Sequence, residues 1–318
     1  MEVENILIEA NQGIKNFRKK NPDWIVIIRW ATATGKSKLS ILLSDFFDVE
    51  IISADSRQIF KYMDIGTDKV SKEIRSKIVH HQIDIVNPDD RYTAWEWQSD
   101  TNKIIKKILN KKKLPIIVWW TWLYIDTIYK NFSMPTAEPD IQLRDELYEK
   151  EKNNPWILHQ ELMKVDQEEW NKIHPNCTRY LVRALEIYYK TGGKKSESFF
   201  EQEVKWPILM LGLSRDKEET NKRINIRIKE MLKQWLIDEV KWLLKKWYTK
   251  DLQSMQWIWY KETIEYLEWE YDIEKLEEKI KRDTHHLAKK QRTWFRRYMM
   301  DEKVNPRKNV IYKVFELN

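Results

Sequence analysis

Glycine, cysteine and long apolar runs are all scarce in this chain of 318 residues. It has six glycines, whereas the usual share of about 7% would give roughly 22. Its single cysteine, Cys177, rules out an internal disulfide and a cysteine-based zinc cluster, which fits a reducing, cytoplasmic setting. No apolar run approaches the roughly 18 residues that span a bilayer, and the acidic N-terminus is unlike a signal peptide, so we expect a soluble chain without membrane contact.

Basic and aromatic residues are plentiful instead. Lysine and arginine together number 57 against 50 aspartates and glutamates, a net charge of +7, and 13% of the residues are aromatic. This balance favours an anionic partner such as a nucleic acid, although an ordinary solvated basic surface carries the same charge. Tryptophan has the most unusual count, with 17 residues.

Hydrophobic patterning predicts an α/β fold. Continuous apolar, β-branched runs are typical of parallel strands buried on both faces, and here they alternate with segments of helical spacing. The expected strands are residues 25–28, 49–52, 82–86, 114–118 and 207–213, and helices are expected at 39–47 and 102–113. The alternation predicts a doubly wound, P-loop NTPase-like parallel sheet flanked by helices, with its chemistry at the carboxyl ends of the strands.

The remaining sequence is charged and has helical periodicity. Residues from about 135 to 195 show no strand runs and predict a helical insertion, and residues 217 to about 301 predict amphipathic helices. We therefore expect a core formed by residues 1–134 and completed by residues 199–318, which include the C-terminal helices. A helical insertion domain, residues 135–198, is expected to interrupt this core.

A phosphate-binding motif follows the first predicted strand. Residues 31–37 match the pattern GxxxxGK[ST], except that Trp30 stands at its first glycine position. A strand before and a helix after it predict that loop amides cradle a diphosphate, that Lys36 neutralises it, and that the Ser37 hydroxyl holds Mg²⁺. The predicted diphosphate-binding residues here are Trp30, Ala31, Thr32, Ala33, Thr34, Gly35, Lys36 and Ser37.

Polar residues also adjoin the next two predicted strands. Asp55 comes just after the second strand, where it can act as a general base or a magnesium ligand, although an aspartate there is equally typical of a helix N-cap. His80 and His81 precede the third strand, but no further ligand lies at a useful spacing, so we expect packing or hydrogen bonding rather than metal binding. Cys177 is expected to be inert.

Seven segments, in this order, resemble the tRNA dimethylallyltransferases, also called isopentenylpyrophosphate transferases. The ordered set covers nearly the whole chain and is far more specific than a P-loop alone. The segments are TATGKS (32–37), ISADSRQ (52–58), MDIGT (63–67), HHQIDI (80–85), IHPN (173–176), RALE (183–186) and LAKKQRTW (287–294).

The resemblance implies transfer of a dimethylallyl group from its pyrophosphate to the exocyclic amine of the adenine just 3′ of a tRNA anticodon. An allylic carbon ionises readily once its pyrophosphate leaving group is stabilised, which P-loop amides, Lys36 and Mg²⁺ on Ser37 can do. The amine must lose a proton as it attacks, and Asp55 matches the family's base. The predicted catalytic residues are Asp55, Lys36 and Thr32.

The resemblance also implies contacts to both substrates. Arg223 and Arg227 are one helical turn apart, and this spacing lets them clamp pyrophosphate or RNA phosphate, although a solvated helix face is the alternative. The adenine must leave its stack, and the helical insertion would close over the anticodon loop of a monomeric enzyme. Gln142 stands where the family has an arginine, with Arg144 nearby. The predicted tRNA-binding residues are Asp55, Ser56, Arg57, Gln58, Thr121, Gln142, Arg179, Tyr180, Leu181, Val182 and Arg183.

Tryptophan stands at ten positions where the family usually has glycine. Glycine accepts φ > 0 and lets a backbone approach a ligand, and an indole does neither. We hypothesise that the gene uses UGA for glycine and that UGA was translated as tryptophan. Ten restorations would give 16 glycines and seven tryptophans, near ordinary usage. The ten are Trp30, Trp95, Trp119, Trp120, Trp122, Trp235, Trp247, Trp257, Trp259 and Trp269.

Two other functions stay open. One is an adenylate prenyltransferase or a P-loop kinase that acts on a small nucleotide, but the basic insertion and C-terminal helices favour tRNA, and the sequence shows no ATP-specific pocket. The other is an inactive RNA-binding relative, which applies if the tryptophans are real, because Trp30 and residues 119–122 would then obstruct the site. Trp97 and Trp294 are expected to be true tryptophans, and Trp242 is undecided.

Overall fold

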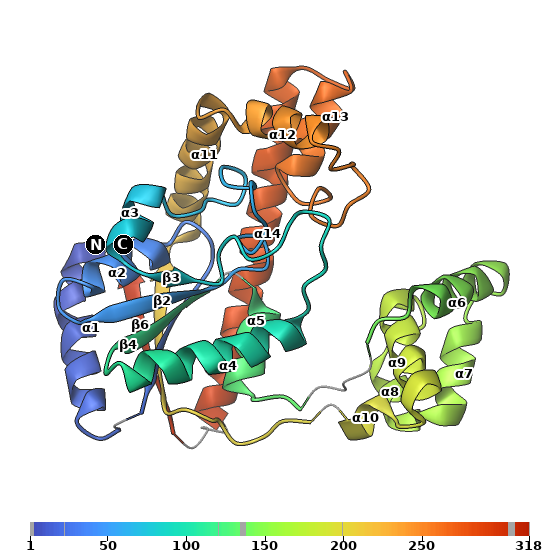
Figure 1. Ribbon diagram of the computed structural model, residues 1–318, viewed down its shortest axis with the longest axis horizontal. Coiled ribbons are helices and arrows are strands. Elements are labelled where there is room, and N and C mark those ends of the chain that lie inside the picture. The colour runs from blue at the N-terminus through green and yellow to red at the C-terminus, as the bar shows by residue number, and fades with distance from the viewer. Residues whose placement is uncertain are drawn as a thin grey trace. The chain divides into compact units, whose positions relative to one another are not determined.

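The structure, a computed structural model, describes residues 3–21, 23–119, 121–133, 138–198, 200–304 and 309–317. Trp120 and the start of the predicted helical insertion, residues 135–137, lie outside these ranges. The chain forms two compact units, one of residues 1–129 with 204–318 and the other of residues 130–203. We call them the core unit and the helical unit and describe each by itself (Figure 1).

The core unit is built on a six-stranded parallel sheet in the order β3-β2-β4-β1-β5-β6. Strands β1 and β2 are buried along their whole length, as expected for strands covered on both faces. The predicted α/β class with a parallel sheet is confirmed. The strands are β1 (Ile25–Arg29), β2 (Val49–Ala54), β3 (His80–His81), β4 (Leu114–Trp119), β5 (Ile208–Arg215) and β6 (Val310–Leu317).

Helices pack against the sheet in two pairs (Figure 1). Helix α1 (Val3–Arg18) packs on α2 (Lys36–Leu43), and α4 (Ala94–Asn110) packs on α5 (Trp122–Tyr129). The apolar side chains of both pairs and of the strands form the main core. A short helix, α3 (Lys72–Lys77), leads into β3.

The C-terminal helices form a second apolar core within the same unit. They also enclose side chains from residues 59–63, which follow β2, so the bundle holds the segment just after Asp55. The four helices are α11 (Lys217–Lys233), α12 (Leu236–Lys245), α13 (Tyr260–Leu267) and α14 (Ile273–Val304).

The helical unit has its own small apolar core. Its longest helix is amphipathic and directs Leu181, Val182 and Leu185 into that core. The helices are α6 (Ile141–Asn153), α7 (Ile157–Val165), α8 (Gln167–Lys172), α9 (Thr178–Thr191) and α10 (Lys195–Ser198).

Five elements differ from the sequence prediction, and two of them, α3 and α5, were not predicted as helices. The strand predicted at 82–86 is wrong: β3 contains only His80 and His81, because Gln82 and Asp84 have φ of 62° and 57° and interrupt the extended backbone. The residues before β1 contain α1, which was not predicted, and β6 was missed at the edge of the sheet. Within the described ranges, no helix is both long and apolar enough to cross a bilayer.

Candidate active site

The P-loop connects β1 to α2 and is held in shape by its own side chains. Gly35 has φ 99°, and a Cβ there would lie 2.6 Å from a side-chain carbon of Val3, so only glycine fits. Thr34 Oγ1 donates to the Ala31 carbonyl oxygen at 3.0 Å, and Lys36 Nζ donates to the same oxygen at 2.6 Å. Both bonds fix the loop around the Ala31 carbonyl oxygen.

A distant helix also takes part in the loop. The Thr32 N–H donates to Gln291 Oε1 on α14 at 2.9 Å, and both residues are buried. Gln291 belongs to the predicted LAKKQRTW segment, but the sequence does not reveal this bond.

The charge of Lys36 is tuned by its surroundings. Burial, which has the largest effect, and the nearby Arg227 lower the pKa of Lys36 to about 7, although Asp55 and Asp68 oppose both effects. These four charged groups therefore lie close enough to interact. A phosphate that binds beside Lys36 adds negative charge and favours its protonated form.

Asp55 lies at the carboxyl end of β2, two strands from the P-loop in the sheet. Its Oδ1 accepts the Arg57 N–H at 2.8 Å within a turn, and no helix begins there, so it is not a helix N-cap. Burial raises the pKa of Asp55 to about 6, although the Arg57 backbone bond and charge oppose this shift. Such a carboxylate is mostly ionised at pH 7 and can take up a proton near neutrality.

Strand β4 separates β1 from β2, and Thr121 follows it. The Ser56 N–H donates to Thr121 Oγ1 at 2.9 Å, and the Thr121 hydroxyl donates to Ser56 Oγ at 3.0 Å. Hydrogen bonds thus join Thr121 to the segment after Asp55, and both carry predicted tRNA-binding residues.

The Gln58 side chain supports this segment from inside. Its Oε1 accepts the Ser53 hydroxyl at 2.9 Å, and its Nε2 donates to the carbonyl oxygens of Thr67 and Asp68, both at 3.2 Å. Gln58 is buried, so its amide is committed to the protein rather than to a ligand.

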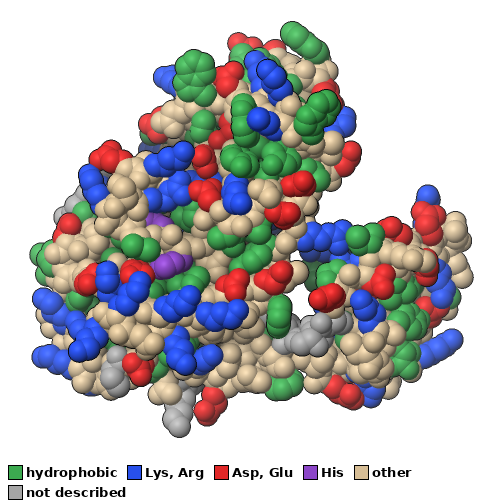
Figure 2. Space-filling model, viewed as in Figure 1, with side chains coloured by type: hydrophobic (Ala, Val, Ile, Leu, Met, Phe, Trp, Pro, Cys, Tyr) green, Lys and Arg blue, Asp and Glu red, His purple; other side chains and the backbone are tan. Residues whose placement is uncertain are grey.

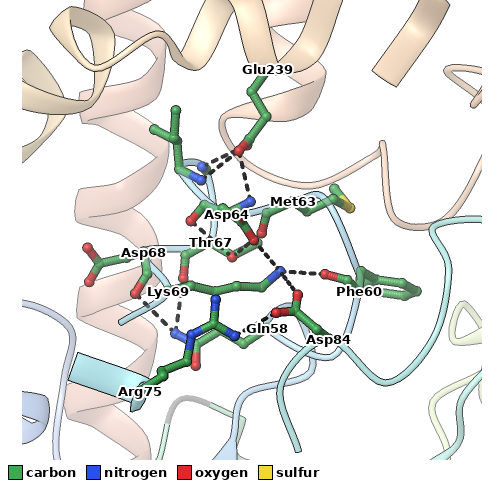
Figure 3. Close-up of polar contacts among 12 residues, drawn as sticks. Gln58, Phe60, Met63, Asp64, Thr67, Asp68, Lys69, Arg75, Asp84 and Glu239 are labelled. Carbon is green, nitrogen blue, oxygen red and sulfur yellow. Dashed lines mark hydrogen bonds and ion pairs between the residues drawn. The ribbon is translucent and has the colours of Figure 1, made fainter. Parts of the chain in front are cut away.

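Figure 3 shows how the loop of residues 63–69 is fixed. Glu239 on α12 accepts the backbone N–H groups of Asp64, Ile65 and Gly66 at 2.8, 2.7 and 3.2 Å. Glu239 could not be selected from the sequence, because it lies about 175 residues from the amides that it binds and leaves no local signal.

A lysine secures the other side of the same loop. Lys69 Nζ donates to the Phe60 carbonyl oxygen and to the carboxylates of Asp64 and Asp84 (Figure 3). Gln58, Glu239 and Lys69 together hold the backbone that carries Asp68.

The two predicted arginines of α11 have different partners. Arg227 forms an ion pair with Asp68 and lies near Lys36, as its effect on the lysine pKa shows. Arg223 Nε is 2.8 Å from Glu219 on its own helix. The structure therefore brings Arg227 to the P-loop lysine and gives Arg223 a partner one turn away.

Two tryptophans lie beside site residues. The guanidinium carbon of Arg57 is 2.5 Å from the ring centroid of Trp257, well inside the roughly 3.5–4.0 Å of relaxed carbon contacts. Trp30 is buried in the main core, where it stacks on Phe295 with ring centroids 5.0 Å apart. Trp257 thus crowds the segment after Asp55, whereas Trp30 packs as a core residue.

The predicted residues of the helical unit divide into exposed and buried groups. Arg179 and Tyr180 are exposed at the start of α9, whereas Leu181 and Val182 are buried in the core of this unit. The Gln142 side chain is exposed and donates to Glu146 at 3.2 Å.

Arg183 and Arg144 share one buried carboxylate. Arg144 donates to both oxygens of Glu186 at 2.7 and 2.8 Å, and Arg183 pairs with the same group at 2.5 Å. Both arginines lower the pKa of Glu186, which is enclosed in the unit. Both arginines are therefore paired with Glu186 within this unit.

The histidine pair is engaged in hydrogen bonds, as predicted. His80 Nδ1 lies 2.7 Å from the Ile78 carbonyl oxygen, and His81 Nε2 lies 2.8 Å from Glu50 Oε2. Among the described residues, no group of three or more His, Cys, Asp or Glu side chains could hold a metal. A Mg²⁺ that bridges phosphates takes most of its ligands from phosphate and water, and the half-buried Ser37 hydroxyl fits that demand.

Basic side chains gather on one face of the core unit. Figure 2 shows Lys and Arg side chains over the region of α4. The exposed lysines of this helix and of the turn after it are Lys103, Lys106, Lys107, Lys111 and Lys112. Such a row suits a polyanion such as RNA.

Comparison with known proteins places these features in one family. The sequence profile described as IPP transferase matches residues 58–298. A tRNA dimethylallyltransferase of Halothermothrix orenii is 40% identical over 302 residues, which cover 93% of this chain and 90% of that protein.

Two solved structures are similar as well. The tRNA isopentenylpyrophosphate transferase of Bacillus halodurans superposes with a TM-score of 0.65 at 32% identity, over 92% of this chain and 90% of that one. A eukaryotic dimethylallyltransferase acting on tRNA gives a TM-score of 0.78 at 29% identity, over 92% and 74% of the two chains.

Proposed function

This chain belongs to the IPP transferase family, and we propose that it moves a dimethylallyl group from dimethylallyl pyrophosphate to a tRNA adenine. The acceptor would be the exocyclic amine of the adenine on the 3′ side of the anticodon. The relatives carry the name tRNA dimethylallyltransferase, and one similar structure acts on tRNA. The observation that carries the proposal is a P-loop with the buried carboxylate of Asp55 at a nearby strand end.

The P-loop would stabilise the leaving group. The bond between the allylic carbon and the pyrophosphate oxygen breaks, and the electron pair goes to that oxygen. Loop amides and the protonated Lys36 would stabilise the growing negative charge, with Arg227 nearby. A pyrophosphate would compete with the Ala31 carbonyl oxygen for Lys36, since both need its ammonium group.

Asp55 would take the proton of the nucleophile. The adenine nitrogen forms the new bond to the allylic carbon and gives up one proton, and pyrophosphate is the other product. A carboxylate whose pKa burial raises to about 6 is ionised at pH 7 and still basic enough to accept that proton. Thr121, bonded to Ser56, would help to position the base.

Mg²⁺ is the proposed cofactor. Bound to the Ser37 hydroxyl and the diphosphate, it would neutralise negative charge on the leaving group. Thr32 would lie beside the diphosphate in the loop, where its backbone N–H donates to Gln291.

The exposed basic and aromatic residues of the helical unit support a tRNA acceptor. Arg179 can pair with phosphate, and the Tyr180 ring can stack on an unpaired base. A small-nucleotide kinase or an adenylate prenyltransferase does not need such exposed residues, because its acceptor is a small molecule. We further propose that the protein acts as a monomer in the cytoplasm, which size-exclusion chromatography with light scattering and imaging of the tagged protein would test.

One labelling experiment separates these functions. The chain with glycine at the ten positions named above is incubated with labelled dimethylallyl pyrophosphate and one of three acceptors. These are an anticodon stem-loop, the same RNA with guanine at the target position, and AMP. Label in the adenine RNA alone is expected. Label in AMP but not in RNA would reassign the protein as a small-nucleotide enzyme.

An Asp55→Asn variant is the matched control. It should transfer no label, because the amide cannot accept the amine proton, and it should keep most of its affinity for the stem-loop, because Asp55 is one of several residues predicted to contact the tRNA. Transfer at the full rate would exclude Asp55 as the base.

A further inference from the structure

Five tryptophans have a backbone conformation that suits glycine. Only a few per cent of non-glycine residues have φ > 0, so about half a residue is expected among the 16 tryptophans described. A bulky side chain makes the conformation still rarer, because the Cβ approaches the following carbonyl oxygen. The five are Trp156 (φ 70°), Trp235 (74°), Trp247 (70°), Trp259 (85°) and Trp269 (63°).

Trp247 and Trp269 end helices in the Schellman arrangement. The Trp247 N–H donates to the Leu244 carbonyl oxygen at 3.1 Å, and the Tyr248 N–H donates to that of Leu243 at 3.2 Å. This pair of bonds requires a left-handed residue, usually glycine, just after the helix.

The second site repeats the pattern. The Trp269 N–H donates to Tyr266, and the Glu270 N–H donates to Glu265. Gly192, which follows α9, has the same φ of 70° as Trp247. The chain thus uses glycine for this conformation in one place and tryptophan in another.

Packing does not explain three of the five tryptophans. The indoles of Trp235, Trp247 and Trp269 are 70%, 89% and 93% exposed, so they contribute little burial that could offset the backbone strain. Trp156 and the buried Trp259 do donate indole hydrogen bonds, to Asn176 and Thr284. The indoles of Trp97, Trp170 and Trp206, which have negative φ, also each donate one, so the feature that the five share is their φ.

We propose that residues 156, 235, 247, 259 and 269 are glycine in the protein that its own cell makes. The codon written here as tryptophan would be UGA, read as glycine, whereas UGG would encode the tryptophans with negative φ and satisfied indoles. Residue 156 is new, because it was not among the ten positions that the family resemblance indicated. With the ten, it brings the count to 11 exchanges, 17 glycines and six tryptophans.

The proposal has a consequence beside Asp55. Trp257 does not have φ > 0, but its ring overlaps the space of the Arg57 guanidinium. Glycine at residue 257 would remove that overlap and leave Arg57 facing the carboxylate whose pKa it helps to lower. The overlap with Arg57 therefore supports glycine at residue 257 as well, independently of φ.

Mass spectrometry of the protein purified from its native cell tests the proposal. Trypsin releases residues 262–275, in which Trp269 is the single tryptophan, and residues 165–172, in which Trp170 is the single one. We expect glycine in the first peptide and tryptophan in the second. Tryptophan at residue 269 would overturn the proposal, and so would glycine at residue 170, because the φ rule would then not discriminate.

The gene gives an independent reading. UGA codons at the five positions, with UGG at residues 170 and 206, are expected. UGG at all five positions would overturn the proposal whatever activity the protein has.

Discussion

Replacing Trp247 or Trp269 by glycine is expected to stabilise the recombinant chain that carries tryptophan. Most mutations destabilise proteins, and removal of an aromatic side chain usually does so strongly. Here the opposite sign follows from the backbone, because both residues have φ between 60° and 75° and end helices in the Schellman arrangement.

The magnitude follows from two opposing terms. A non-glycine residue in the left-handed region costs about 1–2 kcal/mol, which the exchange recovers. Glycine loses more conformational entropy on folding than other residues, so the exchange also costs about 0.5–1 kcal/mol of stability. Because the two indoles are 89% and 93% exposed, little burial is lost. The net gain is about 0–1.5 kcal/mol for each site, with a midpoint of roughly 0.7 kcal/mol, and roughly twice that for both.

Urea unfolding followed by far-ultraviolet circular dichroism measures this gain without relying on tryptophan emission. Trp242→Gly is the matched control, since this exposed residue lies inside α12 and its ring centroid is 5.3 Å from that of Tyr62. It should lose about 1–2 kcal/mol through helix propensity and the ring contact. Equal destabilisation by Trp247→Gly and Trp242→Gly would refute the reasoning.

Two further variants separate the backbone from the indole. Trp247→Ala keeps a Cβ in the left-handed region, so its stability should stay within about 0.5 kcal/mol of the starting chain. Gly192→Ala reverses the exchange where an added Cβ meets nothing within 4 Å, and it should cost about 1 kcal/mol through φ alone. If Gly192→Ala were stabilising, a Cβ at φ > 0 would carry no cost, and the expected gain at residues 247 and 269 would have no basis.

Four other outcomes are expected. Burial raises the pKa of Asp55 from 3.8 to about 6. The carboxyl group therefore favours the folded state fully below pH 3.8, and this contribution is lost as the pH rises through 6. At pH 7, Asp55→Asn should raise the free energy of unfolding by up to about 3 kcal/mol, measured by urea unfolding. The pKa of Lys36 is lowered to about 7, so calorimetry should show that the chain loses pyrophosphate affinity from pH 6 to 8 relative to Lys36→Met, in which the ionisation of pyrophosphate remains but that of Lys36 does not. Glu239→Ala leaves three backbone amides without their carboxylate and should lose about 2–4 kcal/mol, whereas a loss below about 0.5 kcal/mol would show that water replaces it. Arg179→Ala should weaken stem-loop binding in a filter assay at unchanged stability, while Arg183→Ala should lower stability through Glu186; the reverse pattern would exchange their roles.

Much of the fold could be predicted because its central strands are buried on both faces. The apolar runs at 25–28, 49–52, 114–118 and 207–213 stand out in any window, and each lies in a strand of the sheet. The edge strand β6 mixes lysine and glutamate with its apolar residues, so its sequence shows no such run. Helix α1 was not predicted, although its buried residues Val3, Ile6, Ala10, Ile14 and Phe17 follow helical spacing.

The site was predictable where chemistry is local and not where it is distant. The P-loop and Asp55 carry their signal in a few neighbouring residues. Glu239 and Gln291 act on backbone amides 173 to 259 positions away, and no spacing rule links such pairs. Arg183 and Glu186 are three residues apart on α9, so their pairing could be expected from the sequence, whereas the bond from Arg144 on α6 to the same carboxylate could not.

The bond between Thr32 and Gln291 has a consequence for protein synthesis. The loop leaves the ribosome 259 residues before the side chain that holds its amide. At a translation speed of about 5–20 residues per second, that interval lasts roughly 10–50 s. A nascent chain therefore carries an incompletely supported phosphate loop for most of its elongation, and the loop reaches its final form only when α14 has been made.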